Sequence, residues 1–405
     1  MSVPGQDPAD GFVLVLNCGS SSIKVALFDA TARPLSRTPA WRGAVQGIGG
    51  PQARFVDADG AATPLALDAA QPYHAALGHI RRLVAAQLGE RRIAAVAHRV
   101  VHGGSRYGRP VRIDAEVLAD LERYVPLAPL HQPFALEVIG LLLAQQPDLP
   151  QVACFDTAFH RSQPRVEQLF ALPHAMWERG LRRYGFHGLS YAYMAVALPE
   201  RHGAAARGRT IVAHLGSGAS LCAMQDLTSV ATTMGFSALD GLMMGTRCGS
   251  LDPGALLYLM ESERLTPAQV GHLLYHESGL LGVSGRSSDT RVLLQHEASD
   301  ERARDALALY VRRIVREVGA LVALLGGLDL LVFTAGVGEH AAEIRRRVCA
   351  ALGFLGVALD PAANAEHRPL VSAAGSAVKV GVEPTNEEWI IAREALALLA
   401  APPAG

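Results

Sequence analysis

Lysine is nearly absent from this chain. Of the 37 basic residues, all except Lys24 and Lys379 are arginine. A nucleotide-binding P-loop of the form G-x-x-x-x-G-K-[ST] is therefore excluded, because isoleucine and valine precede the two lysines where the motif needs glycine. The formal net charge is only -1, so the charge gives no reason to expect nucleic acid or an anionic membrane as a partner.

Cysteine is also scarce, and no export signal is predicted. The five cysteines are spaced singly, with no C-x-x-C pair, which is typical of reduced thiols in a cytosolic protein. No signal peptide is predicted, because the first residues include Asp7 and Asp10 and lack a basic segment followed by an apolar one. The longest apolar tract, residues 318–338, is broken by Asp329 and by glycines. It predicts a buried helix followed by a buried strand rather than a membrane span, and we expect a cytoplasmic protein.

Apolar residues are abundant in this chain and make up 50% of its 405 positions. At about 100–200 residues per domain, this length suggests two domains. Short runs of valine, isoleucine and leucine alternate with amphipathic stretches, which predicts an α/β protein with mostly buried sheets. The strand candidates are residues 12–16, 93–97, 152–155, 211–214 and 328–333. The helix candidates are residues 73–88, 134–145, 302–325 and 341–352.

Two distant segments of the chain resemble each other. Residues 16–29 can be laid without gaps on residues 213–226, and each has an apolar strand, a glycine and serine turn, and a second strand. This pattern predicts two β-hairpins whose small, polar turns allow close approach of phosphate oxygens. The pair suggests a duplicated domain with a phosphate held in the cleft between the copies. The alternative is two unrelated hairpins.

Two charged residues stand at the ends of predicted strands. Arg99 lies in the run HRVVHGG, and Asp156 lies in FDTAFH. Ligands of α/β sheets bind at the carboxyl ends of strands, so Asp156 is a candidate for acid/base or metal-related work. The alternative for Asp156 is the N-cap of a helix.

Glycine-framed loops carry the next candidates. His187 lies in YGFHG, and His131 lies in the similar LHQP. Arg247 is the only basic residue in the glycine-rich stretch 232–249. An arginine on a glycine loop suits the charge of a transferring phosphoryl group, because it is permanently ionised and donates two hydrogen bonds at once. The alternatives are a surface salt bridge for Arg247 and a local hydrogen bond for either histidine.

The run EPTNEEW near the C-terminus predicts a helix start. Thr385 or Asn386 would be the cap, with acidic residues in the first turn. Glu387 is in addition a candidate for holding Mg²⁺ through water, because magnesium keeps most of its hydration and binds few carboxylates.

A competing hypothesis rests on residues 328–341. A strand leads to Gly336-Val337-Gly338-Glu339-His340-Ala341, which satisfies G-x-G-x-x-[GA], and Asp360 follows at about the distance of a ribose contact. This pattern favours a nicotinamide-dependent oxidoreductase. It lies very late in the chain for a dinucleotide fold, however, and it leaves the two hairpins and the two arginine loops without a purpose.

Taken together, these motifs make the chain resemble the acetate kinase family of short-chain acyl kinases, which are related to sugar kinases, actin and heat-shock chaperone ATPases. The resemblance runs from about Val13 to about Glu394. It rests on an ordered set of elements: the hairpin from Asn17 to Lys24, HRVVHGG, PLHQP, FDTAFH, YGFHG, MGTR, SSD-x-R and TNEE.

The resemblance implies a fold and a domain division. The fold is a duplicated actin-like ATPase fold, ribonuclease H-like in its βββαβαβα order, with two lobes and a hinged cleft. We expect an acyl-binding and phosphate lobe at residues 1–157, closed by the C-terminal helix at 387–405, and a nucleotide-binding lobe at 158–386. The family also implies a homodimer. A chaperone-like or actin-like ATPase shares these lobes but has no use for an arginine and histidine aimed at an acceptor.

The activity implied is reversible transfer of the ATP γ-phosphoryl group to acetate, giving acetyl phosphate and ADP by direct in-line transfer. The partners would be a short-chain carboxylate and a nucleotide, and the cofactor Mg²⁺, with Mn²⁺ as the alternative ion. Asp156, His187 and Arg247 would be catalytic, and Asn17 and Glu387 would serve the metal. The implied substrate-binding residues are Arg99, Val101, Leu130, His131, Phe186 and Ala238. The implied nucleotide-binding residues are Lys24, Ser20, Ser22, His214, Leu215, Gly216, Ser217, Gly218, Asp289, Thr290, Arg291, Gly336, Val337, Gly338, Glu339 and His340.

The chain departs from the family pattern at four of these positions. Ser217 and His340 stand where relatives carry asparagine, and Thr290 stands where an apolar residue is common, which leaves the nucleotide preference open. Ala238 stands where relatives often have proline, at the border of the implied acyl pocket. An apolar pocket discriminates by only about 1–3 kcal/mol per methylene, so acetate is the leading substrate and propionate kinase activity is the alternative.

Overall fold

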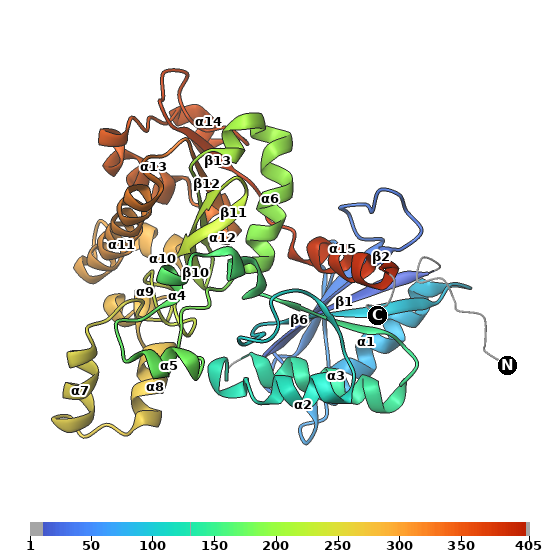
Figure 1. The fold of residues 1–405 in the computed structure, drawn as a ribbon. Helices are drawn as coiled ribbons and strands as arrows, with labels where there is room; N and C mark the ends of the chain where they lie inside the picture. The colour runs from blue at the N-terminus through green and yellow to red at the C-terminus, as the bar shows by residue number, and fades with distance from the viewer. Residues whose placement is uncertain (1–10, 130, 402–405) are drawn as a thin grey trace. The chain divides into compact units, whose positions relative to one another are not determined.

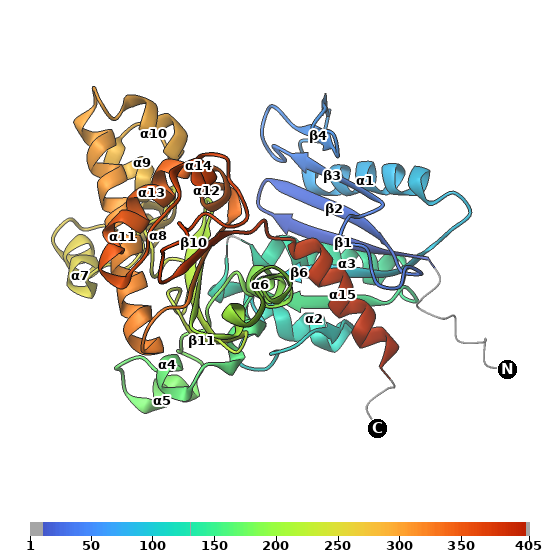
Figure 2. The same ribbon diagram turned by 90° about the horizontal axis from the view of Figure 1, so that it is seen from above.

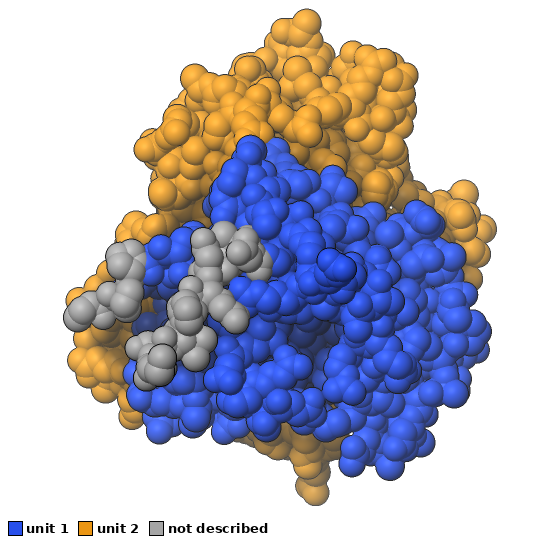
Figure 3. Space-filling model, turned by 90° about the vertical axis from the view of Figure 1, so that its right-hand side faces the viewer, with its two compact units in different colours: residues 1–158, 386–405 blue, residues 159–385 orange. Residues whose placement is uncertain are grey.

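The computed structural model describes residues 11–129 and 131–401. The chain divides into two compact units (Figures 1 and 3). Unit 1 comprises Met1–Ala158 and Asn386–Gly405, and unit 2 comprises Phe159–Thr385. The C-terminal segment thus returns to the unit in which the chain begins.

Within the described residues, unit 1 is built on an eight-stranded sheet in the order β5-β4-β3-β2-β1-β6-β8-β7. β1 pairs antiparallel with β2 and parallel with β6, which in turn pairs parallel with β8. The strands are β1 Phe12–Gly19, β2 Ser22–Asp29, β3 Trp41–Gln46, β4 Arg54–Asp57, β5 Ala62–Pro64, β6 Ile93–Val100, β7 Val111–Arg112 and β8 Gln151–Phe155.

The helices of unit 1 bury apolar stripes against this sheet. α1 presents Ala76, Ile80 and Val84 at helical spacing, and these side chains pack with Leu16 and Val96 in one buried cluster. α15 packs against β1, β6 and β8 (Figure 2). The helices are α1 Pro72–Leu88, α2 Ala115–Glu122, α3 Gln132–Gln145 and α15 Glu387–Ala400.

The described part of unit 2 contains a five-stranded sheet in the order β11-β10-β9-β12-β13. β9 pairs antiparallel with β10 and parallel with β12, and β12 pairs parallel with β13. The strands are β9 Thr210–Leu215, β10 Ala219–Gln225, β11 Thr228–Thr232, β12 Leu330–Thr334 and β13 Lys379–Val382.

Helices make up much of the rest of unit 2. The longest, α11, begins after the N-cap Asp300 and ends at Gly326, which adopts the left-handed conformation of a helix C-terminus. The predicted apolar tract 318–338 is therefore the end of this helix followed by β12. The helices are α4 Arg165–Gln168, α5 His174–Glu178, α6 Gly188–His202, α7 Pro253–Glu261, α8 Pro267–His276, α9 Gly279–Ser284, α10 Thr290–His296, α11 Glu301–Leu325, α12 Ala335–His340, α13 Ala342–Ala351 and α14 Pro361–Ala365.

The two sheets repeat one topology. In each, a three-strand antiparallel meander is followed by two strands that extend the sheet in parallel from its first strand: β1, β2, β3, β6 and β8 in unit 1, and β9 to β13 in unit 2. In each case the chain then passes to the other unit: α4, α5 and α6 follow β8 and lie in unit 2, and α15 follows β13 and lies in unit 1. The predicted duplicated α/β fold is confirmed. No helix among the described residues is both long and apolar enough to cross a membrane.

Candidate active site

In unit 1, three parallel strands end at one edge of the sheet and bring polar side chains together. Asn17 lies near the end of β1, Arg99 near the end of β6, and Asp156 directly after β8. Arg99 donates from Nη2 to Asp156 Oδ2 at 2.6 Å and from Nε to both carboxylate oxygens at 3.1 and 3.2 Å. The Asp156 side chain is only 2% exposed, so its charge is neutralised by this paired contact rather than by water.

The other edge of the Arg99 guanidinium faces Asn17 and Glu387. Nη1 donates to Asn17 Oδ1 at 3.4 Å and lies 3.9 Å from Glu387 Oε2. Burial by itself would lower the pKa of Arg99, but the charges of Asp156 and Glu387 outweigh it and raise that pKa above its ordinary value. Asn386 caps α15 by accepting from the Trp389 backbone N–H, and this cap fixes the start of the helix that carries Glu387.

The first predicted phosphate hairpin is the β1–β2 hairpin of this unit. Asn17 and Lys24 are paired residues in it, so their side chains point from the same face of the sheet. Ser20 lies in the turn, and Ser22 pairs with Gly19 at the first position of β2. The buried Tyr73 hydroxyl donates to the Gly19 carbonyl, which ties the bend to α1.

In unit 2, the β9–β10 hairpin forms the second bend, at residues 216–218. Gly216 N–H donates to the Gly218 carbonyl at 3.0 Å. A Cβ at Gly218 would lie 3.3 Å from His187 Nε2 and 3.5 Å from Arg247 Nη1. Because Gly218 has no side chain, the side chains of His187 and Arg247 can lie close to this bend. Leu215, the last residue of β9, is buried.

His187 is held in an unusual backbone conformation at the start of α6. Its φ of 58° is left-handed, which costs about 1–3 kcal/mol for a residue with a side chain and is found at functional sites. The imidazole stacks on His214, with ring centroids 4.1 Å apart. Its Nδ1 lies 2.8 Å from Ser220 Oγ. Phe186 is braced by His160, whose Nε2 hydrogen-bonds its carbonyl at 2.9 Å.

Arg247 has no carboxylate partner among the described residues of its unit. Its Nη1 donates to the Ala238 carbonyl at 3.2 Å, and burial lowers the pKa of its guanidinium. The alternative of a surface salt bridge is thus not what the structure shows. A largely buried cation whose side-chain hydrogen-bond partners in the described part of the chain are a carbonyl and a thioether is suited to an arriving anion.

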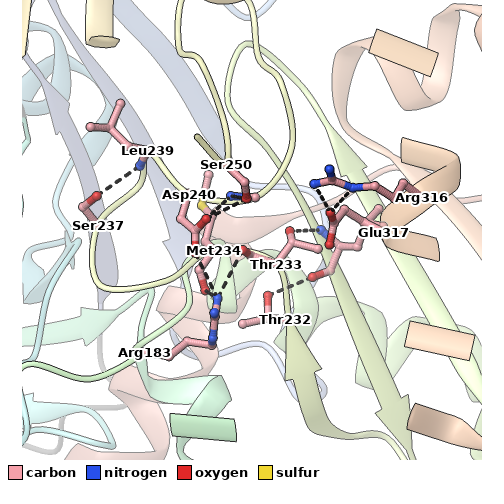
Figure 4. A network of polar contacts seen from close by, with 12 residues as sticks. Arg183, Thr232, Thr233, Met234, Ser237, Leu239, Asp240, Ser250, Arg316 and Glu317 are labelled. Atoms are coloured by element: carbon pink, nitrogen blue, oxygen red, sulfur yellow. Dashed lines mark hydrogen bonds and ion pairs between the residues drawn. The ribbon is translucent and has the colours of Figure 1, made fainter. Parts of the chain in front are cut away.

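The loop that carries Ala238 and Arg247 is fixed by a polar network (Figure 4). Arg183 donates to the carbonyls of Thr233 and Met234 and to Asp240 Oδ2, at 3.1–3.3 Å. Asp240 in turn accepts from Ser250 Oγ at 2.8 Å. Sequence reasoning missed this network, because its members are spread over several turns that only the fold brings together.

The predicted nucleotide loops of unit 2 lie close to the second bend. Gly245 N–H donates to the Ser217 carbonyl at 3.3 Å, and a Cβ on Gly245 would lie 3.4 Å from Ser288, the neighbour of Asp289. A Cβ on Gly216 would lie 3.6 Å from Ala335, beside Gly336. Asp289 is the N-cap of α10 and pairs with Arg291, while Thr290 is buried in the first turn.

A buried arginine supports the loop from Gly336 to His340. Arg345 donates from Nη1 to the carbonyls of Gly338 and Glu339, both at 2.8 Å. Its other nitrogens donate to Asn364, and burial lowers the pKa of its guanidinium to about 10. Sequence reasoning missed Arg345 because it lies in a run of three arginines that reads as a solvated helix face. Val337 and Gly338 lie within α12, and His340 is exposed.

The predicted acyl-binding residues fall in both units. Val101 and His131 lie in unit 1, where Val101 is buried and His131 precedes α3. Phe186 and Ala238 lie in unit 2. Leu130 lies outside the described residues. The structure of either unit alone does not bring these side chains together, so the acyl pocket stays a prediction.

The structure gives the Gly336 loop no dinucleotide-binding context. β12 adjoins β9, the first strand of an antiparallel meander, and only one further parallel strand, β13, follows it in the described chain. Asp360 is not placed for a ribose, because its side chain caps α14 by accepting from Ala362 and Ala363. The oxidoreductase hypothesis is therefore wrong about both features on which it rested.

The duplicated sheets define the class of the fold as a two-unit, actin-like α/β fold. Comparison with known proteins gives the family. The model of the acetokinase family matches residues 12–393. Acetate kinase from Rhodopseudomonas palustris is 50% identical over 386 residues, which cover 94% of this chain and 96% of the relative. The chain belongs to the acetokinase family, as its motifs predicted.

Solved structures agree with this assignment. Acetate kinase from Porphyromonas gingivalis superposes with a TM-score of 0.85 at 38% identity, over 96% of this chain and 100% of the other. A propionate kinase from Francisella tularensis superposes with a TM-score of 0.86 at 34% identity, over 95% and 98% of the two chains. The backbone fold alone therefore does not separate the two acyl specificities.

Proposed function

We propose that this protein is an acetate kinase, which transfers the γ-phosphoryl group of ATP reversibly to acetate and forms acetyl phosphate and ADP. The similarity to proteins named acetate kinase over nearly the whole chain supports this activity. The observation that carries the chemistry is the pair of His187 and Arg247 beside the Gly218 bend, with no carboxylate on the arginine among the described residues of unit 2.

The reaction places simple demands on the chain. An acetate oxygen forms a bond to the γ-phosphorus in line with the bond to the β,γ-bridging oxygen, which breaks and leaves ADP. Catalysis then depends on alignment and on neutralising charge on the phosphoryl oxygens. In our proposal, Arg247 and His187 donate to those oxygens, and the surrounding bend offers backbone N–H groups.

The unit 1 cluster would bind the acceptor. Asp156 occupies the Nε and Nη2 edge of Arg99 and holds the guanidinium in one orientation. We propose that Arg99 grips the acetate carboxylate with its remaining donors, and that Asp156 is the catalytic carboxylate that orients it. Lys24, from the same face of the hairpin as Asn17, would bind the phosphates.

The donors at this edge also fit magnesium. Asn17 offers an amide oxygen and Glu387 a carboxylate at the edge where Asp156 lies, and a hard ion such as Mg²⁺, or Mn²⁺ in its place, prefers oxygen ligands with retained water. Bound there, the ion would offset charge on the nucleotide phosphates. Asn17 and Glu387 are the residues that would hold it.

The nucleotide would bind in unit 2. The proposed contacts are the β9–β10 bend, Asp289 to Arg291 and the Gly336 to His340 loop. Asp289 and Arg291 form an exposed ion pair with each other. This ion pair would border the nucleotide site.

A hydroxamate assay tests the activity. With Mg²⁺, ATP and hydroxylamine, the purified protein should form acetyl hydroxamate from acetate faster than propionyl hydroxamate from propionate. Asp156→Asn should lose turnover, whereas Asp120→Asn should keep it, because Asp120 is also a buried, arginine-paired aspartate but lies in α2, away from the strand ends. No hydroxamate from either acid would refute the proposal, and a preference for propionate would correct the substrate.

We also propose that the protein is a homodimer. α7 has no buried residue, and its Leu257, Tyr258 and Met260 are 58%, 57% and 40% exposed. An apolar helix with no buried side chain is typical of an association surface. Light scattering should give a dimer for the native chain and a monomer for Leu257→Glu with Tyr258→Glu, and a monomeric native chain would refute the proposal. The cytoplasmic location expected from the sequence also stays a proposal, and cell fractionation tests it.

A further inference from the structure

Behind His187 lies a chain of two hydrogen bonds that the proposed reaction does not itself require. Its Nδ1 lies 2.8 Å from Ser220 Oγ on β10, and Ser220 Oγ lies 2.5 Å from the Tyr191 hydroxyl on α6. Both Ser220 and Tyr191 are completely buried. The three groups therefore form a series from the imidazole into the core of unit 2.

The direction of the hydrogens in this series follows from the partners of Tyr191. Burial raises the pKa of its phenol well above the ordinary value, so the phenol keeps its proton. Ser220 Oγ is the hydrogen-bond partner of that hydroxyl among the described residues, and a buried donor without an acceptor is costly. Tyr191 therefore donates to Ser220, and the Ser220 hydrogen is left to point at His187 Nδ1.

An imidazole nitrogen that accepts a hydrogen bond carries no proton. Neutral His187 then has its hydrogen on Nε2. In the opposite tautomer, Nδ1–H would donate to Ser220, and one hydroxyl hydrogen, that of Ser220 or that of Tyr191, would lose its acceptor in the core. The cost of an unmet buried donor favours the first tautomer by roughly tenfold to a hundredfold in population.

The protonated nitrogen is also the one that faces the bend. A Cβ on Gly218 would lie 3.3 Å from His187 Nε2. The stacked His214 has a similar arrangement: its Nδ1 lies 2.9 Å from Ser190 Oγ, and its Nε2 lies 3.8 Å from a Cβ on Gly216. Serine hydroxyls thus hold both Nδ1 atoms, and both Nε2 atoms point to one bend.

We propose that Tyr191 and Ser220 are positioning residues that fix the tautomer of His187, so that its Nε2–H is a donor aimed at the Gly216–Gly218 bend. The part of this inference that makes a phosphoryl oxygen the acceptor rests on the proposed function. The tautomer itself does not.

Nitrogen-15 NMR of the histidine-labelled full chain, without substrates, tests the tautomer directly. The His187 resonances, assigned by comparison with His187→Gln, should show Nε2 protonated and Nδ1 unprotonated. Ser220→Ala should shift them toward a mixture, because no hydroxyl then donates to Nδ1. Tyr310→Phe is the matched control, since it removes another buried hydroxyl of unit 2 that has no hydrogen-bond partner among the described residues. A native His187 protonated at Nδ1, or an unchanged tautomer in Ser220→Ala, would overturn the proposal.

Kinetics test the consequence. We expect Ser220→Ala to lower kcat about tenfold, with KM for ATP and acetate changed less than twofold, and Tyr310→Phe to match the native enzyme. A rise in KM alone, or a kcat equal to that of Tyr310→Phe, would contradict the positioning role. If the native protein had no acetate kinase activity, the proposed function would fail, while the NMR result would still decide the tautomer.

Discussion

Replacing Arg247 with alanine separates catalysis from stability in this protein. The guanidinium is largely buried, has no carboxylate partner among the described residues of unit 2, and contacts the Ala238 carbonyl and the Met244 sulfur. Burial lowers the pKa of this guanidinium, because it disfavours the charged form. The side chain therefore contributes little to folding, and its place beside Gly218 is explained by the chemistry instead.

The magnitude for activity follows from the role of a fixed donor in the transition state. Loss of one such donor costs about 2.7–4 kcal/mol, which is about 10²–10³ in kcat. For stability we expect a change within about 1 kcal/mol, because Arg247→Ala breaks one hydrogen bond to a carbonyl and also removes the cost of burying an unpaired charge.

Arg99→Ala is the comparison variant, because its stability should differ from that of Arg247→Ala. Asp156 is 2% exposed, and without Arg99 it would be a buried carboxylate that has lost the bidentate partner described above. Breaking a buried ion pair from one side typically costs about 3–5 kcal/mol. Both variants should be nearly inactive, but only Arg99→Ala should be markedly less stable.

The assays are hydroxamate formation at saturating ATP and acetate, and urea unfolding of the same preparations. Arg247→Lys should restore little activity, because an ammonium group cannot donate in the planar, bidentate manner of a guanidinium. If Arg247→Ala kept more than a tenth of the native kcat, or if it lost as much stability as Arg99→Ala, the reasoning from burial and missing counter-charge would be refuted.

Three further predictions concern other parts of the chain. Arg345→Met should raise KM for ATP at least tenfold and leave KM for acetate nearly unchanged, because the carbonyls of the Gly336 to His340 loop lose their donor; equal changes in both constants would contradict this. Gly78→Ala should raise the free energy of unfolding by about 0.5–1 kcal/mol, because Gly78 lies inside α1 with open space above it, and a loss of stability would show that the space is filled. Burial lowers the pKa of His98 and of His160 to about 4, below the unfolded value of about 6.5. Each histidine therefore takes up a proton on unfolding, so between pH 6.5 and 4 the free energy of unfolding should fall by about 1.4 kcal/mol per pH unit for each, and a flat profile in urea titrations would refute it.

Each strand or helix candidate of the sequence corresponds to an element of the structure, because its signals are local. The candidate helix at 302–325 differs by one residue from α11, since a capping aspartate and a terminal glycine mark its ends. The internal similarity between residues 16–29 and 213–226 identified both hairpins, because strand, turn and strand lie within fourteen positions. The ordered motifs were enough to indicate the family.

The tertiary structure decided what each charged or polar residue contacts. The parallel pairing of β6 and β8 sets Asp156 against Arg99, 57 positions away, a contact that the sequence did not indicate. Arg345 had the appearance of a surface residue until the fold placed it under a glycine loop. The tautomer of His187 depends on Ser220, which comes from another element. Periodicity and capping are read along the chain, whereas a hydrogen bond or a buried ion pair depends on separations in space that only the packed sheets fix.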